Sequence, residues 1–204
     1  MILLINHNIF AEDDFVLNKL NFCRFTKSTS NNYEPEKFIT SNNLLRSSGE
    51  LSIYCGEKII VHGTVVDQNC VPVADAKVYL WQVNCKGKYP YTPLRTAVKD
   101  SEFVELDQET TFTGNGIATT NNKGQFYFVT IYPERIHDLS PHANIRVEHY
   151  KLGSLQARLT LKGHSVSNPT LNPELGYLAE FVTENYTTIY DFKVVMPGVT
   201  LKEY

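Results

Sequence analysis

Hydrophobic and polar residues alternate along much of the chain after residue 51, and many hydrophobic positions carry β-branched or aromatic side chains. In the segment 76–83, Val78 and Leu80 alternate with Lys77 and Tyr79. This period of two places successive side chains on opposite faces of a strand. The segment 58–65 is rich in β-branched residues, which also favours a strand. Further strands are predicted at 117–120, 125–131, 144–150, 155–161 and 188–196.

Residues that favour tight turns separate these segments. The sequence Asn-Asn-Lys-Gly at 121–124 offers a glycine for the positive φ of a hairpin, and a proline-containing turn spans 67–72. Helical periodicity is scarce, with one short stretch at 13–20 and one weak candidate at 172–184. Many short strands with turns between them predict an all-β fold, either an antiparallel β-sandwich or a barrel.

The first 50 residues differ from the rest of the chain. Polar runs rich in Ser, Thr and Asn occur at 26–33 and 40–48, and such side chains compete for backbone hydrogen bonds and favour loops. A chain of 204 residues is long for one compact domain and short for two. We therefore expect an irregular N-terminal arm at 1–50, lying over a neighbour or over a pocket, and one domain at 51–204.

Charge and hydropathy exclude several classes of partner. The chain has 19 Lys and Arg residues against 22 Asp and Glu residues, a net charge of −3. This balance gives no broad positive field, so we expect neither nucleic acid nor an anionic membrane surface as a partner. No segment approaches the roughly 18 apolar residues that a membrane-spanning helix needs.

The cysteines and the N-terminus predict the compartment. Cys23, Cys55, Cys70 and Cys85 are separated by 32, 15 and 15 residues and include no C-x-x-C pair. Four reduced thiols are the favoured interpretation, with a zinc site or a disulfide framework as alternatives. The apolar residues at 1–5 lack a basic flank and are followed by acidic residues at 12–14, so no secretory signal is expected. The prediction is a cytoplasmic protein.

Common catalytic motifs are missing from the sequence. It contains no Walker loop, no G-x-G-x-x-G between a strand and a helix, and no G-x-S-x-G elbow. His7, His62 and His164 stand apart from other ligating residues and are expected to be ordinary surface or core histidines.

Three segments taken together are more specific, at 59–89, 116–133 and 141–159. The most distinctive element is W-Q-x-N-x-x-G-x-Y, which here runs from Trp81 to Tyr89. In this order and spacing the segments resemble the intradiol ring-cleavage dioxygenases, above all the protocatechuate 3,4-dioxygenases, over about half of the chain. The resemblance implies a β-sandwich with a non-haem Fe(III) that binds a catechol, whose ring dioxygen opens between the two hydroxylated carbons, without an organic cofactor.

The family holds its iron with two tyrosines and two histidines. Anionic phenolate oxygens suit the hard ferric ion, and imidazoles complete the coordination. Carried over from the resemblance, Tyr89 and His142 retain two ligand positions. Ile136 stands where the family has its second tyrosine, and Asn144 stands at the second histidine. The neighbouring His137 is a candidate substitute ligand.

The same resemblance suggests which kind of family member this is. The iron-free subunit of the family carries a P-H-x-N element and an arginine in a later strand, as at His142, Asn144 and Arg158 here. An arginine that precedes the family's histidines would fall near Ser140. The arm element that completes the substrate pocket is matched loosely by Thr29 and Tyr33, which with Arg158 are the predicted substrate-pocket residues.

The favoured hypothesis is a non-catalytic or iron-poor member of the family, because too few metal ligands remain. It would work beside a catalytic homologous subunit or as a homo-oligomer. One alternative is an active Fe(III) dioxygenase that cleaves a small aromatic diol with Tyr89, His137 and His142 as ligands. Another is a transthyretin-like binding module unrelated to catechols.

Overall fold

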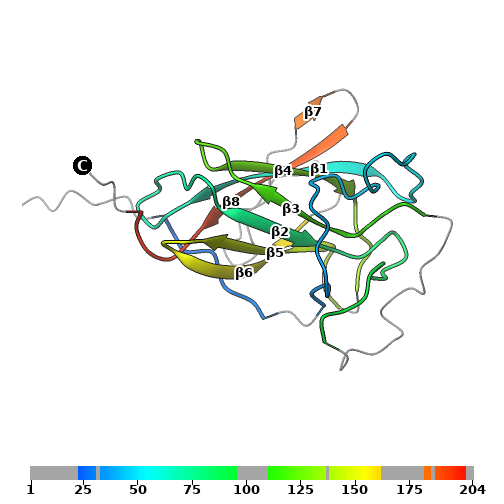
Figure 1. Cartoon of the computed structure of the whole chain (residues 1–204), viewed down its shortest axis with the longest axis horizontal. Coiled ribbons are helices and arrows are strands. Elements are labelled where there is room, and N and C mark those ends of the chain that lie inside the picture. The colour runs from blue at the N-terminus through cyan, green and yellow to red at the C-terminus, as the bar shows by residue number, and fades with distance from the viewer. Residues whose placement is uncertain are drawn as a thin grey trace, which may run out of the picture.

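The computed structural model describes residues 23–30, 33–95, 110–136, 138–161, 182–184 and 187–200, the segment 182–184 by its backbone alone. Two four-stranded sheets pack face to face, and Figure 1 shows one above the other. The strands are β1 (Lys58–Val66), β2 (Lys77–Trp81), β3 (Asn115–Thr119), β4 (Gln125–Ile131), β5 (His142–His149), β6 (Gly153–Thr160), β7 (Val182–Glu184) and β8 (Thr187–Val195). The all-β sandwich is therefore confirmed.

The order of strands is β4-β1-β8-β7 in the first sheet and β3-β2-β5-β6 in the second. All pairs in the second sheet are antiparallel. In the first sheet, β1 and β8 run parallel, with Ile59 opposite Thr188 and Val66 opposite Val195. The sandwich thus contains a parallel pair, which the sequence did not predict. Strand direction depends on how distant segments meet, which local alternation does not encode.

All seven predicted strands are present, with ends that differ by up to a few residues. The three-residue strand β7 was not predicted, and the helix expected at 172–184 is wrong for 182–184, which form this strand. The other residues of that segment, and the helix expected at 13–20, lie outside the described residues. Hydrogen bonding to β8, which sequence periodicity does not report, defines β7.

The hydrophobic core lies between the two sheets. Alternate residues of each strand point inward, which is why Val78 and Leu80 of β2 are fully buried between the two sheets. The first sheet contributes mainly aromatic and β-branched side chains, and the second mainly aliphatic ones. Members of the core include Ile59, Val61, Leu80, Phe126, Phe128, Ile145, Leu159 and Phe192.

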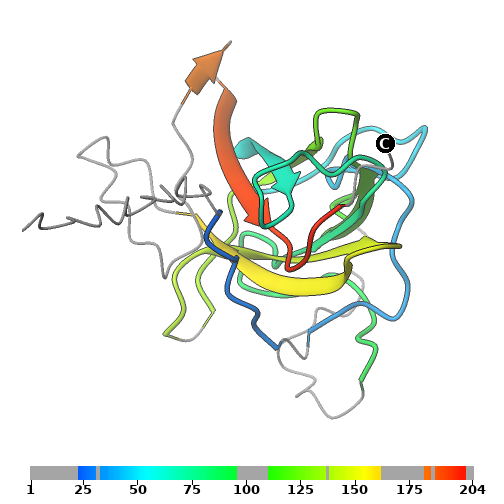
Figure 2. The same cartoon turned by 90° about the vertical axis from the view of Figure 1, so that its left-hand side faces the viewer.

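The described part of the arm closes both open sides of the sandwich (Figure 2). On one side, the backbone N–H of Thr26 donates to Val195 of β8, and that of Thr29 donates to Gln156 of β6. On the other side, the segment 39–44 connects β3 with β4, and Leu44 and Leu45 enter the core. Gly116 permits this approach, because a Cβ there would overlap the carbonyl oxygen of Ser41. A boundary between arm and domain at residues 50 and 51 stays a prediction.

The cysteines form two disulfides, Cys23–Cys70 and Cys55–Cys85, with Cα–Cα distances of 5.3 and 5.9 Å. The prediction of four reduced thiols is therefore wrong. One bond joins the arm to the turn between β1 and β2, and the other joins the segment before β1 to the loop after β2. Sequence spacing did not reveal these pairs, because strand pairing brings the partners together.

Candidate functional site

A second hydrophobic cluster lies outside the sandwich core. Trp81, Val83, Tyr89 and Ile136 are buried together, from the end of β2, the loop that follows it and the segment after β4. Half-buried aromatic residues complete the cluster, namely Tyr33, Phe38, Tyr79 and Tyr91. The cluster brings together Tyr89 and Ile136, two of the four residues that the family resemblance assigns to the iron site.

The register of the second sheet places the other two positions on its outer face. Asn144 of β5 lies between Trp81 of β2 and Arg158 of β6, and His142 pairs with Thr160 of β6. Because residues two apart on a strand share a face, His142 and Asn144 point to the same side as Trp81. This face is opposite to the side chains of Ile145 and Ala143, which enter the core between the sheets.

Tyr89 and Asn144 contact each other directly. The Asn144 Nδ2 group donates a hydrogen bond of 3.4 Å to the Tyr89 hydroxyl oxygen, and both residues are almost completely buried. The ring of Tyr33 stacks on that of Tyr89 with 4.8 Å between centroids, so this predicted pocket residue does lie at the site. Asn144 Oδ1 is buried and has no hydrogen-bond partner.

Ile136, which the family resemblance assigns to the position of the second tyrosine, carries an apolar side chain. It is only 6% exposed and packs with Trp81 and Tyr89. A backbone bridge between Ile136 and Leu139 turns the chain toward β5. His137, the candidate substitute ligand, lies outside the described residues.

His142 is buried at the start of β5, and its Nδ1 lies 2.8 Å from the carbonyl oxygen of Ser140. Burial lowers the pKa of His142, the charge of Arg158 lowers it further, and the bond to Ser140 opposes both effects. A neutral imidazole donates from Nδ1 to that carbonyl and keeps Nε2 as an acceptor. Ser140, expected near the family's arginine position, thus contributes only its backbone oxygen in this contact.

The two remaining predicted pocket residues lie on or beside β6. Arg158 is half-buried on the outer face, and its Nε is buried without a hydrogen-bond partner. Thr29 donates its backbone N–H to Gln156, two residues before Arg158, at the edge of the same strand. No described contact connects Thr29 to Tyr89 or His142.

Arg146 is a residue of this face that sequence analysis did not identify. Its guanidinium carbon lies 4.3 Å from the centre of the Tyr79 ring and 5.5 Å from that of Phe38. It also forms ion pairs with Glu34 of the arm and, at 3.0 Å, with Glu148. These contacts hold the arm over the outer face, and no sequence motif marks them.

The residues at the family's iron position fit Fe(III) poorly. Ile136 offers no donor atom, and the amide of Asn144 is directed to the oxygen through which Tyr89 would bind metal. Arg158 adds a permanent positive charge beside His142, which opposes a trivalent cation. Within the described residues, no group of three or more His, Cys, Asp and Glu side chains is placed to hold a metal ion.

Comparison with known proteins identifies the class. A family model described as "Dioxygenase" matches residues 29–145. A candidate dioxygenase of Rickettsia typhi is 46% identical over 199 residues, which are 97% of this chain and 93% of that protein. The protocatechuate 3,4-dioxygenase beta chain of Burkholderia cepacia is 35% identical over 78 residues, 38% of this chain and 30% of that one.

Solved structures agree at the level of fold. The intradiol ring-cleavage dioxygenase of Tetranychus urticae matches with a TM-score of 0.61 at 16% identity, over 89% of this chain and 98% of that one. The chain belongs to the intradiol dioxygenase family. This membership favours the family interpretation over an unrelated transthyretin-like module.

The described part of the chain contains no helix with the length and apolar character needed to cross a bilayer.

Proposed function

We propose that this protein is a non-catalytic, iron-free member of the intradiol dioxygenase family that serves as a structural or binding subunit. The observation that carries the proposal is the pair Ile136 and Asn144 at family ligand positions. The first is packed against Tyr89, and the second donates a hydrogen bond to it. An active site of this family would need Tyr89 as a metal-bound phenolate. The hydrogen bond from the Asn144 amide and the apolar Ile136 beside the ring instead favour the neutral, metal-free phenol.

Arg158 supports the same conclusion by a separate route. Like charges repel each other strongly in an environment of low effective dielectric constant, and the charge of a trivalent ion multiplies the repulsion from the Arg158 guanidinium. A guanidinium that is charged at every physiological pH therefore disfavours Fe(III) at this face. It also provides a positive charge where a metal would otherwise neutralise bound anions.

Metal analysis of the purified full-length chain tests the proposal. Protein produced in iron-supplemented medium should contain far less than one iron per chain and show no visible tyrosinate-to-iron absorption band. One tightly held iron per chain with that band would refute it and favour the active dioxygenase that uses Tyr89, His137 and His142. Tyr89→Phe would then have to abolish the band and the ring opening of protocatechuate or catechol.

A reconstruction variant provides the matched positive control. Ile136→Tyr, Asn144→His and Arg158→Gln together restore the family's residue types at three positions. This triple variant should take up iron and develop the absorption band under conditions in which the wild-type chain does not. The same three positions changed to Phe, Gln and Lys give a control of similar bulk and should stay iron-free.

A non-catalytic chain of this kind would work beside a catalytic homologous subunit or as a homo-oligomer. Its similarity to the beta chain of protocatechuate 3,4-dioxygenase, a protein named as one of several chains, supports the proposal of a homologous partner subunit or a homo-oligomer. Light scattering of the purified chain, alone and with co-expressed family members, measures this. A strictly monomeric chain in every mixture would contradict it.

The disulfides change the proposed location. The cytoplasmic prediction depended in part on reduced thiols, and both described pairs are bonded. Because disulfides persist mainly in oxidising compartments, we propose maturation outside a reducing cytoplasm. Alkylation of the protein in intact cells, followed by mass spectrometry, should find all four cysteines protected.

A further inference from the structure

The first sheet presents a row of three polar or aromatic side chains on its outer face, away from the family's iron position. Tyr127 of β4 lies directly opposite His62 of β1, and His62 lies beside Asp191 of β8. Partners in register across neighbouring strands point to the same face of a sheet. The row therefore crosses three strands that lie far apart in the sequence.

His62 is oriented by Asp191. The His62 Nδ1 lies 2.7 Å from Asp191 Oδ1, and both side chains are partly exposed. The bond between Nδ1 and this carboxylate leaves Nε2 to hydrogen-bond a ligand. The carboxylate therefore fixes the direction of the ring.

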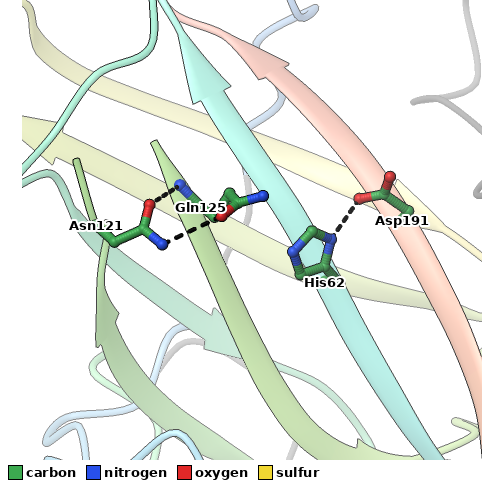
Figure 3. A network of polar contacts seen from close by, with 4 residues as sticks. All are labelled: His62, Asn121, Gln125 and Asp191. Carbon is green, nitrogen blue, oxygen red and sulfur yellow. Dashed lines mark hydrogen bonds and ion pairs between the residues drawn. The ribbon is translucent and has the colours of Figure 1, made fainter. Parts of the chain in front are cut away.

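A second polar pair lies on the same side of the sheet. Asn121 Nδ2 donates to Gln125 Oε1 at 3.2 Å, and Asn121 Oδ1 accepts the backbone N–H of Gln125 at 2.9 Å. Figure 3 shows this pair and the pair of His62 with Asp191 on one face, with the Gln125 side chain between Asn121 and His62. The amides are thus held by the hairpin between β3 and β4.

A groove of about 490 Å³ runs beside these side chains. Its described lining includes His62, Asn121, Gln125 and Tyr127, with walls from the arm segment 40–42 and from β3. This volume lies within the roughly 300–1000 Å³ of small-molecule sites. None of the described lining residues is Lys, Arg, Asp or Glu.

Tyr127 gives the groove an apolar platform. It is 52% exposed, although an aromatic ring of this size is usually more buried. Its backbone is held in place, because Asn42 Nδ2 donates to the Tyr127 carbonyl oxygen at 3.3 Å. An exposed ring with a fixed backbone is a preformed surface on which a ligand can lie flat.

We propose that this groove binds a neutral, polyhydroxylated ligand, a saccharide, with one sugar ring stacked on Tyr127 and its hydroxyls bonded by Gln125 and His62. The C–H face of a sugar matches an aromatic ring, and its hydroxyls both donate and accept hydrogen bonds, so they can pair with a side-chain amide and with an imidazole nitrogen. A phosphate or carboxylate finds no lysine or arginine in the described lining, and an apolar ligand would leave the amides unpaired. The saccharide site needs no iron and does not depend on the proposed function.

Titration of the full-length chain with three neutral trisaccharides tests this: maltotriose, cellotriose and triacetylchitotriose. Amide chemical shifts in ¹H–¹⁵N spectra report the location of binding. We expect at least one of the three to bind with a dissociation constant of about 1 mM or tighter, which is −4.1 kcal/mol or better. The shifts should concentrate at 61–63 and 125–128.

Variants separate a stacking platform from a general effect. Tyr127→Ala should weaken binding at least tenfold, about 1.4 kcal/mol, whereas Tyr127→Phe should retain it because the ring remains. His62→Phe should weaken binding severalfold by removing the hydrogen bond of the imidazole Nε2. Tyr150→Ala is the matched control, since Tyr150 is an exposed tyrosine of the other sheet's end and should have no effect.

Two results would overturn the saccharide site. One is that none of the three trisaccharides binds at concentrations up to 10 mM, which is roughly ten times the expected dissociation constant. The other is binding that Tyr127→Ala leaves unchanged while the folded spectrum is retained. Loss of binding in the Tyr150→Ala control would also reject this groove as the location.

Discussion

The two disulfides lead to a quantitative prediction of stability. Cys23–Cys70 spans 47 residues and Cys55–Cys85 spans 30. A cross-link stabilises the folded state by lowering the conformational entropy of the unfolded chain, and the cost of closing a loop grows with the logarithm of its length. At 25 °C the loop-closure relation gives about 4 kcal/mol for the first bond and about 3.7 kcal/mol for the second, each considered alone.

The two loops overlap, because Cys55 lies inside the loop that Cys23–Cys70 closes. With one bond already formed, the second restricts the unfolded chain less than it would alone. Replacing one pair by serine should therefore cost less than the single-bond value. The variant with all four serines should lose more free energy of unfolding than the two pair variants combined.

Urea unfolding at pH 7 without reductant, followed by circular dichroism, measures these losses. Wild-type protein in reductant should unfold at the urea midpoint of the four-serine variant, which reductant should leave unchanged. Four reactive thiols in the denatured, unreduced wild-type protein would refute the argument at its start. Pair variants with the wild-type midpoint would show that neither bond restricts the unfolded chain.

Three further predictions concern other parts of the structure. Ile136→Ala should lower the free energy of unfolding by about 3 kcal/mol in urea, and Ile136→Val by about 1 kcal/mol, because the side chain is packed; a loss near zero for Ala would contradict this. Burial raises the pKa of Asp67, but hydrogen bonds from Thr200 and from two turn amides outweigh this effect and lower the pKa below its ordinary value. The carboxylate therefore stabilises the folded state above pH 4, and this stabilisation is lost as the pH falls further. Asp67→Asn should make the thermal midpoint less dependent on pH in this range. Arg146→Ala removes the ion pair with Glu34 and should speed protease cleavage of the arm, with an unchanged rate as the contrary result.

The strands were predictable because the alternation of side chains is a local property. Segment 125–131 was placed without error, since its inward Phe126 and Phe128 alternate with half-buried or exposed neighbours. Strand β7 has only three residues, too few for a periodic signal. The parallel pairing of β1 with β8 and both disulfides depend on contacts between distant segments, for which one sequence carries no pattern.

The candidate site was predictable in composition and not in geometry. The family resemblance selected Tyr89, Ile136 and Asn144, and the structure brings all three to one face. It gave no sign that the Asn144 amide would bond to the Tyr89 hydroxyl. Nor could it find the row on the opposite sheet, where Asp191 meets His62 only through the register of a parallel pair.

The contacts around Tyr89 bear on the proposal that Ile136 and Asn144 stand at ligand positions of the family. A buried phenol needs a hydrogen-bond partner, which Asn144 supplies, and an apolar neighbour, which Ile136 supplies. A histidine at position 144 alone would remove the hydrogen bond from the Asn144 amide to the phenol, while Ile136 still offered no ligand. A tyrosine at position 136 alone would bury a second hydroxyl beside the face that carries Arg158, with no metal to bind that hydroxyl. We therefore expect each single change to cost stability without completing a coordination sphere, whereas the triple reconstruction changes all three positions together.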